Sequence, residues 1–314
     1  MEHYVTLFDG SFLPQGLALL DSLERHAGVH MLWVLCLDDR VRQVLDDLAK
    51  PNVRTIPLGE VETPELLAIK PGRSRAEYCW TLTPFTPRFV FERDRTVTRV
   101  TYLDADLFLL KSPRPIFEEF EVSGKSILIT EHAYDAEYDR SADHGYFCVQ
   151  FMTFVRGTSE PVRGWWEARC LDWCFARLEE GKFGDQKYLD DWPDRFPDRV
   201  HILQQADAIL APWNARRFPY SKAIAWHFHS LRIEGRRVRW YLGYEIPEVV
   251  EAQVYRPYLS ILARHIGELG GTFAQGESES RLMGFLGWGN FALQRLPSLA
   301  RRVWRRKVTR LPGI

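Results

Sequence analysis

Residues 99–110 read Arg-Val-Thr-Tyr-Leu-Asp-Ala-Asp-Leu-Phe-Leu-Leu, an apolar run that ends in Asp104 and Asp106 and is followed at once by a second apolar run. Alternation along a strand predicts that the two carboxylates share one side. At the carboxyl end of a strand they would stand at the edge of an α/β sheet, where ligands bind. Two close carboxylates repel each other unless a cation lies between them, and Mg2+ or Mn2+ prefers such oxygen donors. Because Asp-x-Asp is also common in solvated loops, this candidate metal site needs support from the rest of the chain.

The chain alternates between predicted strands and helices. Strands are expected over 3–8, 31–37 and 53–58, and helices over 16–26 and 41–49. This order is typical of a doubly wound, mostly parallel central sheet flanked by helices, so the predicted fold class is α/β. The remaining expected elements are a helix over 81–92 broken by Pro84 and Pro87, a loop over 134–145, a helix over 161–180, and strands over 126–130, 146–155, 200–204 and 224–230.

Composition and charge indicate a globular protein with a large core. The 314 residues are 46% hydrophobic and include 11 tryptophans, unlike a disordered chain. The net charge of −1 conceals eight basic and no acidic residues over 281–314, which leaves −9 for the rest. Five cysteines without Cys-x-x-Cys spacing predict a reduced, cytoplasmic protein. The first residues lack the pattern of a signal peptide, and no apolar run reaches the length of a spanning helix.

Two further segments are candidates for ligand binding. Asp9 follows the first predicted strand, where its side chain either approaches a ligand or caps a helix. Residues 70–75, Lys-Pro-Gly-Arg-Ser-Arg, lead into a helix, and Arg73 and Arg75 with that helix amino terminus would attract phosphate. A solvated basic loop is the alternative interpretation of the same residues.

Two histidines offer a third metal ligand. His227 and His229 stand at alternate positions of the strand expected over 224–230. Either imidazole with the two aspartates would leave room for a diphosphate to complete an octahedral shell. A histidine in a core strand is more often structural, so both interpretations stay open at this point.

The order of these motifs resembles that of one enzyme family. The motifs are Asp9, Gly-Leu-Ala-Leu-Leu-Asp-Ser-Leu from 16, the helix region 77–87, Tyr-Leu-Asp-Ala-Asp from 102, Gly-Asp-Gln-Lys-Tyr-Leu from 184, Trp213-Asn214 and Trp-His-Phe-His from 226. Together they resemble GT-A glycosyltransferases of the clan that contains glycogenin and the bacterial lipopolysaccharide glucosyl- and galactosyltransferases. The resemblance covers residues 1–235 and is greater still to an uncharacterised bacterial branch of that clan.

The resemblance implies a GT-A fold and the transfer of a sugar, with retention, from a nucleoside-diphosphate sugar, expected to be a UDP-sugar. It implies Mn2+ or Mg2+ bound by Asp104, Asp106 and His227, where the metal neutralises charge on the leaving diphosphate. The resemblance also implies that Thr6 and Asp9 lie near the base and ribose, and that Arg73 and Arg75 contact phosphate or cover the site. Arg232 is a further candidate for phosphate binding, and Asp185 and Gln186 would face the reacting carbon of the sugar. Which of these last two side chains stabilises an oxocarbenium-like state stays open.

The chain departs from the family pattern at two places. The usual Asn-Ala-Gly after Tyr-Phe appears here as Cys148, Val149 and Gln150, which leaves the sugar of the donor undefined. The usual Gly and Lys after the histidine are replaced by Ser230 and Arg232. Arg232 would bind phosphate as a planar fork instead of a point charge.

Two other functions compete with sugar transfer as interpretations of these motifs. A haloacid-dehalogenase-like phosphatase also needs Asp-x-Asp after a strand, but Phe108 stands where that family has Thr or Val, and Gly184 follows an expected helix end instead of a strand. A non-catalytic nucleotide-sugar-binding module is the second rival. A binding module has no catalytic activity, so this interpretation predicts that Asp185→Asn changes none.

The expected domains are a catalytic domain over 1–240, a helical extension and flexible link over 241–280, and a basic tail over 281–314. From Ser298 onward, apolar residues fall on one helical face and Arg and Lys on the other. This pattern predicts an interfacial helix on an anionic membrane, at the inner face, with a lipid-linked or envelope-glycan acceptor. A surface helix packed on the protein is the alternative, and no motif favours nucleic acid.

Overall fold

The computed structural model describes residues 1–235, 237–240, 243–270 and 307–312. The chain forms two compact units, Met1–His227 and Phe228–Ile314. Among the described residues, no helix combines the length and the apolar composition that crossing a bilayer requires.

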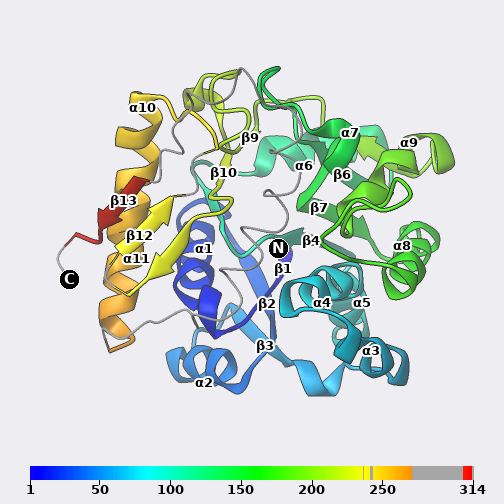
Figure 1. Ribbon diagram of the computed structural model, residues 1–314. Coiled ribbons are helices and arrows are strands. Elements are labelled where there is room, and N and C mark those ends of the chain that lie inside the picture. Colours follow the sequence, from blue (N-terminus) through cyan, green and yellow to red (C-terminus); the bar gives the residue numbers. More distant parts are fainter. Residues whose placement is uncertain (236, 241–242, 271–306, 313–314) are drawn as a thin grey trace. The chain divides into compact units, whose positions relative to one another are not determined.

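The first unit is built on a seven-stranded sheet in the order β3-β2-β1-β4-β7-β6-β8 (Figure 1). Its strands are β1 (Glu2–Phe8), β2 (His30–Cys36), β3 (Val53–Pro57), β4 (Arg99–Leu103), β6 (Ile127–Glu131), β7 (Phe147–Val155) and β8 (Val200–Ile202). Only β7 runs antiparallel to its two neighbours in this sheet. The prediction of an α/β fold with a mostly parallel sheet is therefore confirmed.

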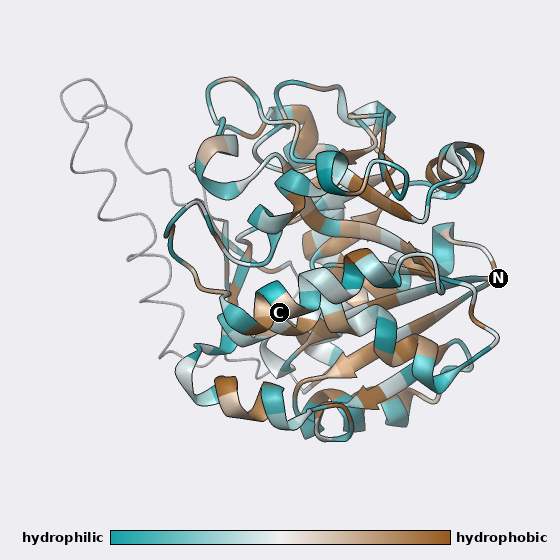
Figure 2. Ribbon diagram, turned by 90° about the vertical axis from the view of Figure 1, so that its right-hand side faces the viewer, coloured by the Kyte–Doolittle hydropathy of each residue, from teal (hydrophilic) through white to brown (hydrophobic). Residues whose placement is uncertain are grey.

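Helices stand on both sides of strands β1 to β3 in Figure 1, and brown, hydrophobic segments occur along strands in Figure 2. The helices of this unit are α1 (Leu13–His26), α2 (Asp39–Leu48), α3 (Pro64–Ile69), α4 (Arg75–Leu82), α5 (Thr86–Arg93), α6 (Arg114–Ser123), α7 (Ser141–His144), α8 (Glu160–Asp172) and α9 (Trp192–Arg195). Local signals set several boundaries. The Asp38 side chain accepts from the Val41 N–H at the start of α2, and Ser74 with Glu77 forms a capping box at the start of α4.

The helix expected over 161–180 is shorter than predicted. It ends at Asp172, and Trp173 takes an extended backbone. The carbonyl of Trp173 accepts a hydrogen bond from the Tyr188 hydroxyl at 2.8 Å. A tertiary contact thus replaces the helical continuation that the sequence pattern favoured. The break in the helix at Pro84 is confirmed by a 3-10 turn over Thr83–Phe85. The break expected at Pro87 is wrong, because Pro87 lies in the first turn of α5, where a proline is tolerated.

A second sheet of the first unit has the order β5-β10-β9 and consists of β5 (Leu107–Leu109), β9 (Ile209–Leu210) and β10 (Ala225–His227). Strand β10 is antiparallel to β5, and its register places His227 opposite Leu107. The strand expected over 224–230 therefore ends earlier, before Ser230, whose φ is 62°. This register brings the end of β10 beside the Asp-Ala-Asp stretch.

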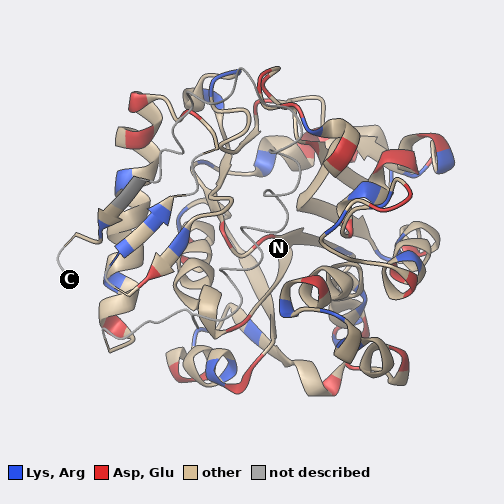
Figure 3. Cartoon of the chain, viewed as in Figure 1, with Lys and Arg blue, Asp and Glu red and all other residues tan. Residues whose placement is uncertain are grey.

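The second unit contains a three-stranded antiparallel sheet and a helical segment. The sheet joins β11 (Arg232–Glu234), β12 (Arg237–Trp240) and β13 (Lys307–Arg310), and the helical segment comprises α10 (Glu248–Val250), a π-helical turn (Glu251–Tyr255) and α11 (Arg256–Glu268). The helix expected from Ser298 is wrong at Lys307–Arg310, because these residues pair as a strand with β12. The remainder of that prediction and the flexible link over 271–280 lie outside the described residues. Basic residues mark β11 and β12 in Figure 3.

Candidate metal centre and reaction site

The Asp-Ala-Asp stretch is a turn that joins the two sheets of the first unit. Asp104 follows β4, and Asp106 precedes β5. The Asp104 N–H donates to the Gln150 carbonyl at 3.1 Å, and the Leu107 N–H donates to the Asp104 carbonyl at 3.0 Å. The two carboxylates therefore converge through a tight turn, and the predicted reason, alternation along one strand, is wrong.

His227 completes a group of three side chains at this turn. Its Nε2 lies 3.1 Å from Asp106 Oδ1 and 3.6 Å from Asp104 Oδ2, and one donor atom of each residue lies within 4.8 Å of the others. Two carboxylate oxygens and an imidazole nitrogen suit a divalent cation, and three protein donors leave positions for a ligand. The set thus fits the metal that the sequence predicts. His229 belongs to the second unit and lies outside strand β10.

The charges at this centre are poorly solvated. Burial raises the pKa of the Asp104 carboxyl, and the charge of Asp106 adds to this rise while His227 opposes it. Burial by itself would lower the pKa of His227, but Asp106 and then Asp104 raise it well above its usual value. The protein thus holds two acids close together in a site where a cation would relieve their repulsion.

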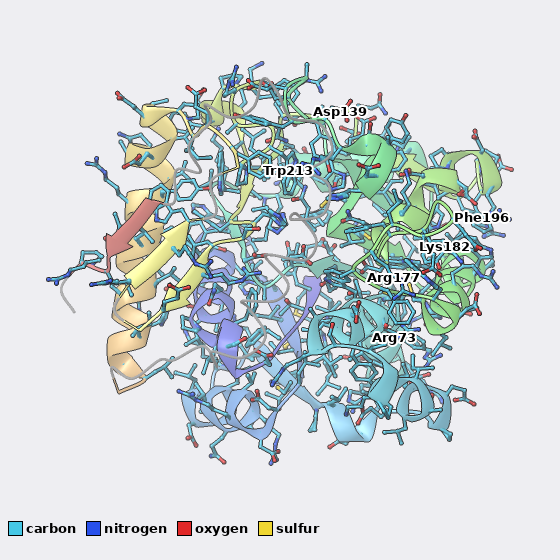
Figure 4. All side chains as sticks on the ribbon, in the orientation of Figure 1. Arg73, Asp139, Arg177, Lys182, Phe196 and Trp213 are labelled. Atoms are coloured by element: carbon cyan, nitrogen blue, oxygen red, sulfur yellow. The ribbon has the colours of Figure 1, made fainter. Side chains whose placement is uncertain are left out.

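Three side chains that the sequence analysis did not assign support the ligands. The Tyr102 hydroxyl donates to Asp104 Oδ1 at 2.8 Å, and Gln150 Oε1 lies 2.7 Å from His227 Nδ1. The ring of Trp213, labelled in Figure 4, stands edge-on to the His227 ring with 5.4 Å between centroids. Tyr102 sits two residues before Asp104, which is a signal that the sequence offered. The contacts of Gln150 and Trp213 depend on residues far apart in the chain.

Asp185 and Gln186 follow a left-handed Gly184, whose φ is 55°. The Trp166 indole donates to the Asp185 carbonyl at 2.8 Å, and the Gln186 amide donates to the His144 carbonyl at 2.8 Å. Burial, with the charge of Asp104, raises the pKa of the Asp185 carboxyl to about 8. Its Oδ2 has no hydrogen-bond partner within the part of the chain that the structure describes. The structure therefore brings Asp185 under the influence of the acid cluster and ties the Gln186 side chain to the backbone.

Of the residues predicted to contact the nucleotide, Asp9 and Arg75 meet beside the carboxyl ends of β1 and β2. Asp9 Oδ1 accepts from the Ser11 N–H at 2.7 Å, so it caps the short turn after β1, and it also forms an ion pair with Arg75. Arg75 donates to Asp38 Oδ2 at 3.1 Å as well. Thr6 is fully buried in β1, and its hydroxyl has no partner among the described residues.

Arg73 lies elsewhere. It donates to Thr81 Oγ1 and to the carbonyls of Cys170 and Leu171 at 2.6 and 2.8 Å. Arg73 and Arg177, both labelled in Figure 4, lie over the ring of Phe175. The Arg73 guanidinium thus joins α4 to the end of α8, and the structure does not bring it together with Arg75. Arg232 begins β11 of the second unit, and its contact with phosphate stays a prediction.

Comparison with known proteins identifies the fold. The chain matches no protein-family model. It is similar to the crystal structure of the galactosyltransferase LgtC in complex with donor and acceptor sugar analogs, with a TM-score of 0.50 and 14% identity over 90% of this chain and 99% of that one. The protein therefore has the GT-A fold of glycosyltransferases, and this prediction is confirmed.

Two proteins of Bacillus subtilis (strain 168) are similar in sequence. YfnD is 28% identical over 293 residues, which cover 86% of this chain and 92% of YfnD. YfnF is 30% identical over 248 residues, which cover 73% of this chain and 82% of YfnF. The chain belongs to the same family as YfnF. Both relatives are described as uncharacterized proteins, as expected from the resemblance to an uncharacterised bacterial branch.

Proposed function

We propose that this protein is a metal-dependent glycosyltransferase that moves a sugar from a nucleoside-diphosphate sugar, with UDP as the expected nucleotide, to a glycan or lipid-linked acceptor with retention. The single observation that carries the proposal is the convergence of Asp104, Asp106 and His227 on one point of a GT-A fold. LgtC, which shares this fold, is a galactosyltransferase.

The three side chains would hold Mn2+ or Mg2+. Such an ion supplies Lewis-acid chemistry, since it neutralises negative charge on a diphosphate leaving group. The protein contributes a fixed, buried arrangement of donors: Tyr102 orients Asp104, and Gln150 contacts the far side of the His227 ring. Their bonds keep the donor atoms in place before a ligand arrives.

Asp185 is the better of the two candidates for contact with the reacting sugar carbon. Its carboxylate has an oxygen without a partner among the described residues, whereas the Gln186 amide is bonded to a backbone carbonyl. Developing positive charge at the sugar carbon is stabilised by the anionic form of Asp185. Without a metal its pKa is about 8, and a cation on Asp104 would offset the second cause of this rise. We therefore expect the activity of the metal-loaded enzyme to rise with pH as this carboxyl ionises, below pH 8. Gln186 would position the segment that carries Asp185.

Nucleotide binding is proposed at the carboxyl ends of β1 and β2. Thr6 and Asp9 would contact the base and ribose, and the Asp9–Arg75 ion pair would open so that Arg75 reaches a phosphate. Arg232 is a second phosphate candidate. Arg73 could contact phosphate only by giving up its hydrogen bonds to two backbone carbonyls. It is therefore the weakest of the three arginine candidates for phosphate binding.

The basic segment over 281–314 is proposed to contact the inner face of a membrane, which would supply a lipid-linked acceptor. The charge of four arginines in this segment can be reversed by substitution while β13 is kept: Arg301, Arg302, Arg305 and Arg306. Replacing these four by Glu should abolish binding to vesicles that contain anionic lipid. Equal binding of the variant and the wild type would exclude this contact.

The test of the main proposal is a panel of nucleotide sugars with Mn2+, scored by release of nucleoside diphosphate, with Asp104→Ala as the control. Release with at least one donor, lost in Asp104→Ala, is expected. Turnover of a simple aryl phosphate without nucleotide-sugar hydrolysis would favour the phosphatase instead. A phosphatase of this kind requires a strand directly before Gly184. Within the described residues, Gly184 is preceded only by an isolated bridge between Glu179 and Lys182.

A further inference from the structure

Gln150 contacts both chain segments that carry the proposed metal ligands. It lies in β7, beside the turn between β4 and β5, and its side chain is fully buried. Its carbonyl oxygen accepts from the Asp104 N–H at 3.1 Å. Its side-chain Oε1 lies 2.7 Å from His227 Nδ1. One residue of β7 therefore meets the end of β4 through its backbone and the end of β10 through its amide.

The contact with His227 involves the ring nitrogen that faces away from the acids. The other nitrogen, Nε2, lies 3.1 Å from Asp106 Oδ1 and is the only one that can offer a lone pair to a cation there. A neutral imidazole carries its proton on one nitrogen, and an amide oxygen only accepts hydrogen bonds. In the neutral ring that can bind a cation, Oε1 at Nδ1 keeps the single proton on Nδ1 and leaves the lone pair on Nε2.

We propose that Gln150 is a positioning residue that fixes the tautomer and the ring orientation of His227 for metal binding. The proposal rests on the metal site of the proposed function. The resembled family has a glycine at the corresponding position, which has no side chain to make this bond. The amide at 150 is thus a feature of this chain, and partners of this kind typically strengthen metal binding 10–100-fold.

A merely structural role is the alternative, because Gln150 is also a buried polar group in a core strand. Thr153 offers a matched control in the same strand. Its hydroxyl is buried and bonded to the Thr101 hydroxyl at 2.9 Å, a bond to neither of the proposed aspartate ligands nor to His227. Thr153→Val removes a buried hydrogen bond of β7 without touching His227, so it reports general loosening of the strand.

The experiment titrates Mn2+ alone into four proteins and follows free Mn2+ by electron paramagnetic resonance. The proteins are the wild type, Gln150→Met, Gln150→Glu and Thr153→Val. Methionine keeps the length of the side chain but is only a weak acceptor, so we expect Gln150→Met to raise the Kd roughly 10–100-fold. Glutamate keeps an accepting oxygen and makes the imidazole more basic, so Gln150→Glu should bind at least as tightly as the wild type. Thr153→Val should bind within about twofold of the wild type.

The outcomes separate this inference from the proposed function, since no nucleotide sugar is used. A wild type that does not bind Mn2+ would remove both the proposed metal site and the role of Gln150. If the wild type binds Mn2+, two results would overturn the role of Gln150 alone. One is an unchanged Kd in Gln150→Met, and the other is an equal rise in the Kd of Thr153→Val. If Gln150→Met fails to fold, as judged by circular dichroism, the shorter Gln150→Asn replaces it, with the same loss expected. Weaker binding by folded Gln150→Glu also refutes the inference.

Discussion

Asp185→Asn should stabilise the ligand-free protein at alkaline pH, although Asp185 is proposed to act in catalysis. Burial and the charge of Asp104 raise the pKa of this carboxyl from 3.8 to about 8. In the unfolded chain the group ionises near its ordinary pKa. Between these two values the unfolded state has lost a proton that the native state keeps, so wild-type stability falls as the pH rises through this window. Asparagine carries no charge at any of these pH values, and the variant should escape this loss.

The magnitude follows from the difference between the two pKa values. The rise from 3.8 to about 8 is roughly four units, and each unit corresponds to about 1.4 kcal/mol, which sets an upper limit of about 6 kcal/mol above pH 8. Relaxation and entry of water reduce the cost of a buried charge. We therefore expect Asp185→Asn to raise the free energy of unfolding by about 2–4 kcal/mol at pH 8.5, and by about 1 kcal/mol or less at pH 5.

The assay is urea unfolding in EDTA at pH 5 and pH 8.5. Asp191→Asn is the control, because Asp191 is exposed and pairs with Arg195 at 2.9 Å. A surface pair of this kind contributes about 0–1 kcal/mol, so its loss should not stabilise the protein. The same gain for Asp185→Asn at both pH values, or no gain at pH 8.5, would show that the native carboxyl ionises without the cost assigned to it.

Three further predictions concern packing and charge. A Cβ at Gly16 in α1 would lie 2.4 Å from the Phe8 ring. Gly16→Ala should therefore lower the free energy of unfolding by about 1–3 kcal/mol in urea unfolding, although alanine favours helix more than glycine does. The control Gly164→Ala in α8, where the space is open, should not lower it. Burial and then the neighbouring His144 lower the pKa of His132 to about 3. Below pH 6.5 the unfolded chain therefore binds a proton at this residue that the native state does not bind. In urea unfolding, the free energy of unfolding of the wild type should fall by about 2–3 kcal/mol between pH 7 and pH 4.5, more than that of His132→Phe. Arg73→Ala removes hydrogen bonds to two carbonyls at the end of α8 and should lower the thermal midpoint, at a cost of about 2–4 kcal/mol, while Mn2+ affinity stays unchanged.

The positions and types of most elements could be predicted because their signals are local. The strands of the central sheet are short apolar runs bounded by turn residues, which is the pattern of buried strands. The helix expected over 161–180 was too long, since the bond between Tyr188 and the Trp173 carbonyl is invisible to helical periodicity. The periodicity of Lys307–Arg310 predicts helix instead of strand for a similar reason, because the pairing of these residues with β12 depends on residues about 70 positions away.

The sequence also offered Asp104, Asp106 and two candidate histidines for the metal site, but not how these side chains meet. Asp104 and Asp106 were expected on one strand, and the structure places them in a turn between two sheets. The choice between two histidines was open until the register of β10 on β5 put His227 at the turn. Arg73 and Arg75 looked alike in the sequence, yet one bonds helix carbonyls and the other meets Asp9.

By itself, the sequence determined the kinds of donors, the alternation of strands and helices, and the basic tail, because composition and periodicity act over a few residues. Only the tertiary structure decided which imidazole joins the acids, that the Gln150 amide meets it, and that Asp185 is buried near Asp104 with a raised pKa. These properties arise from distances between segments far apart in the chain and from the removal of water around them. These distances and this exclusion of water are established only when the sheets have formed.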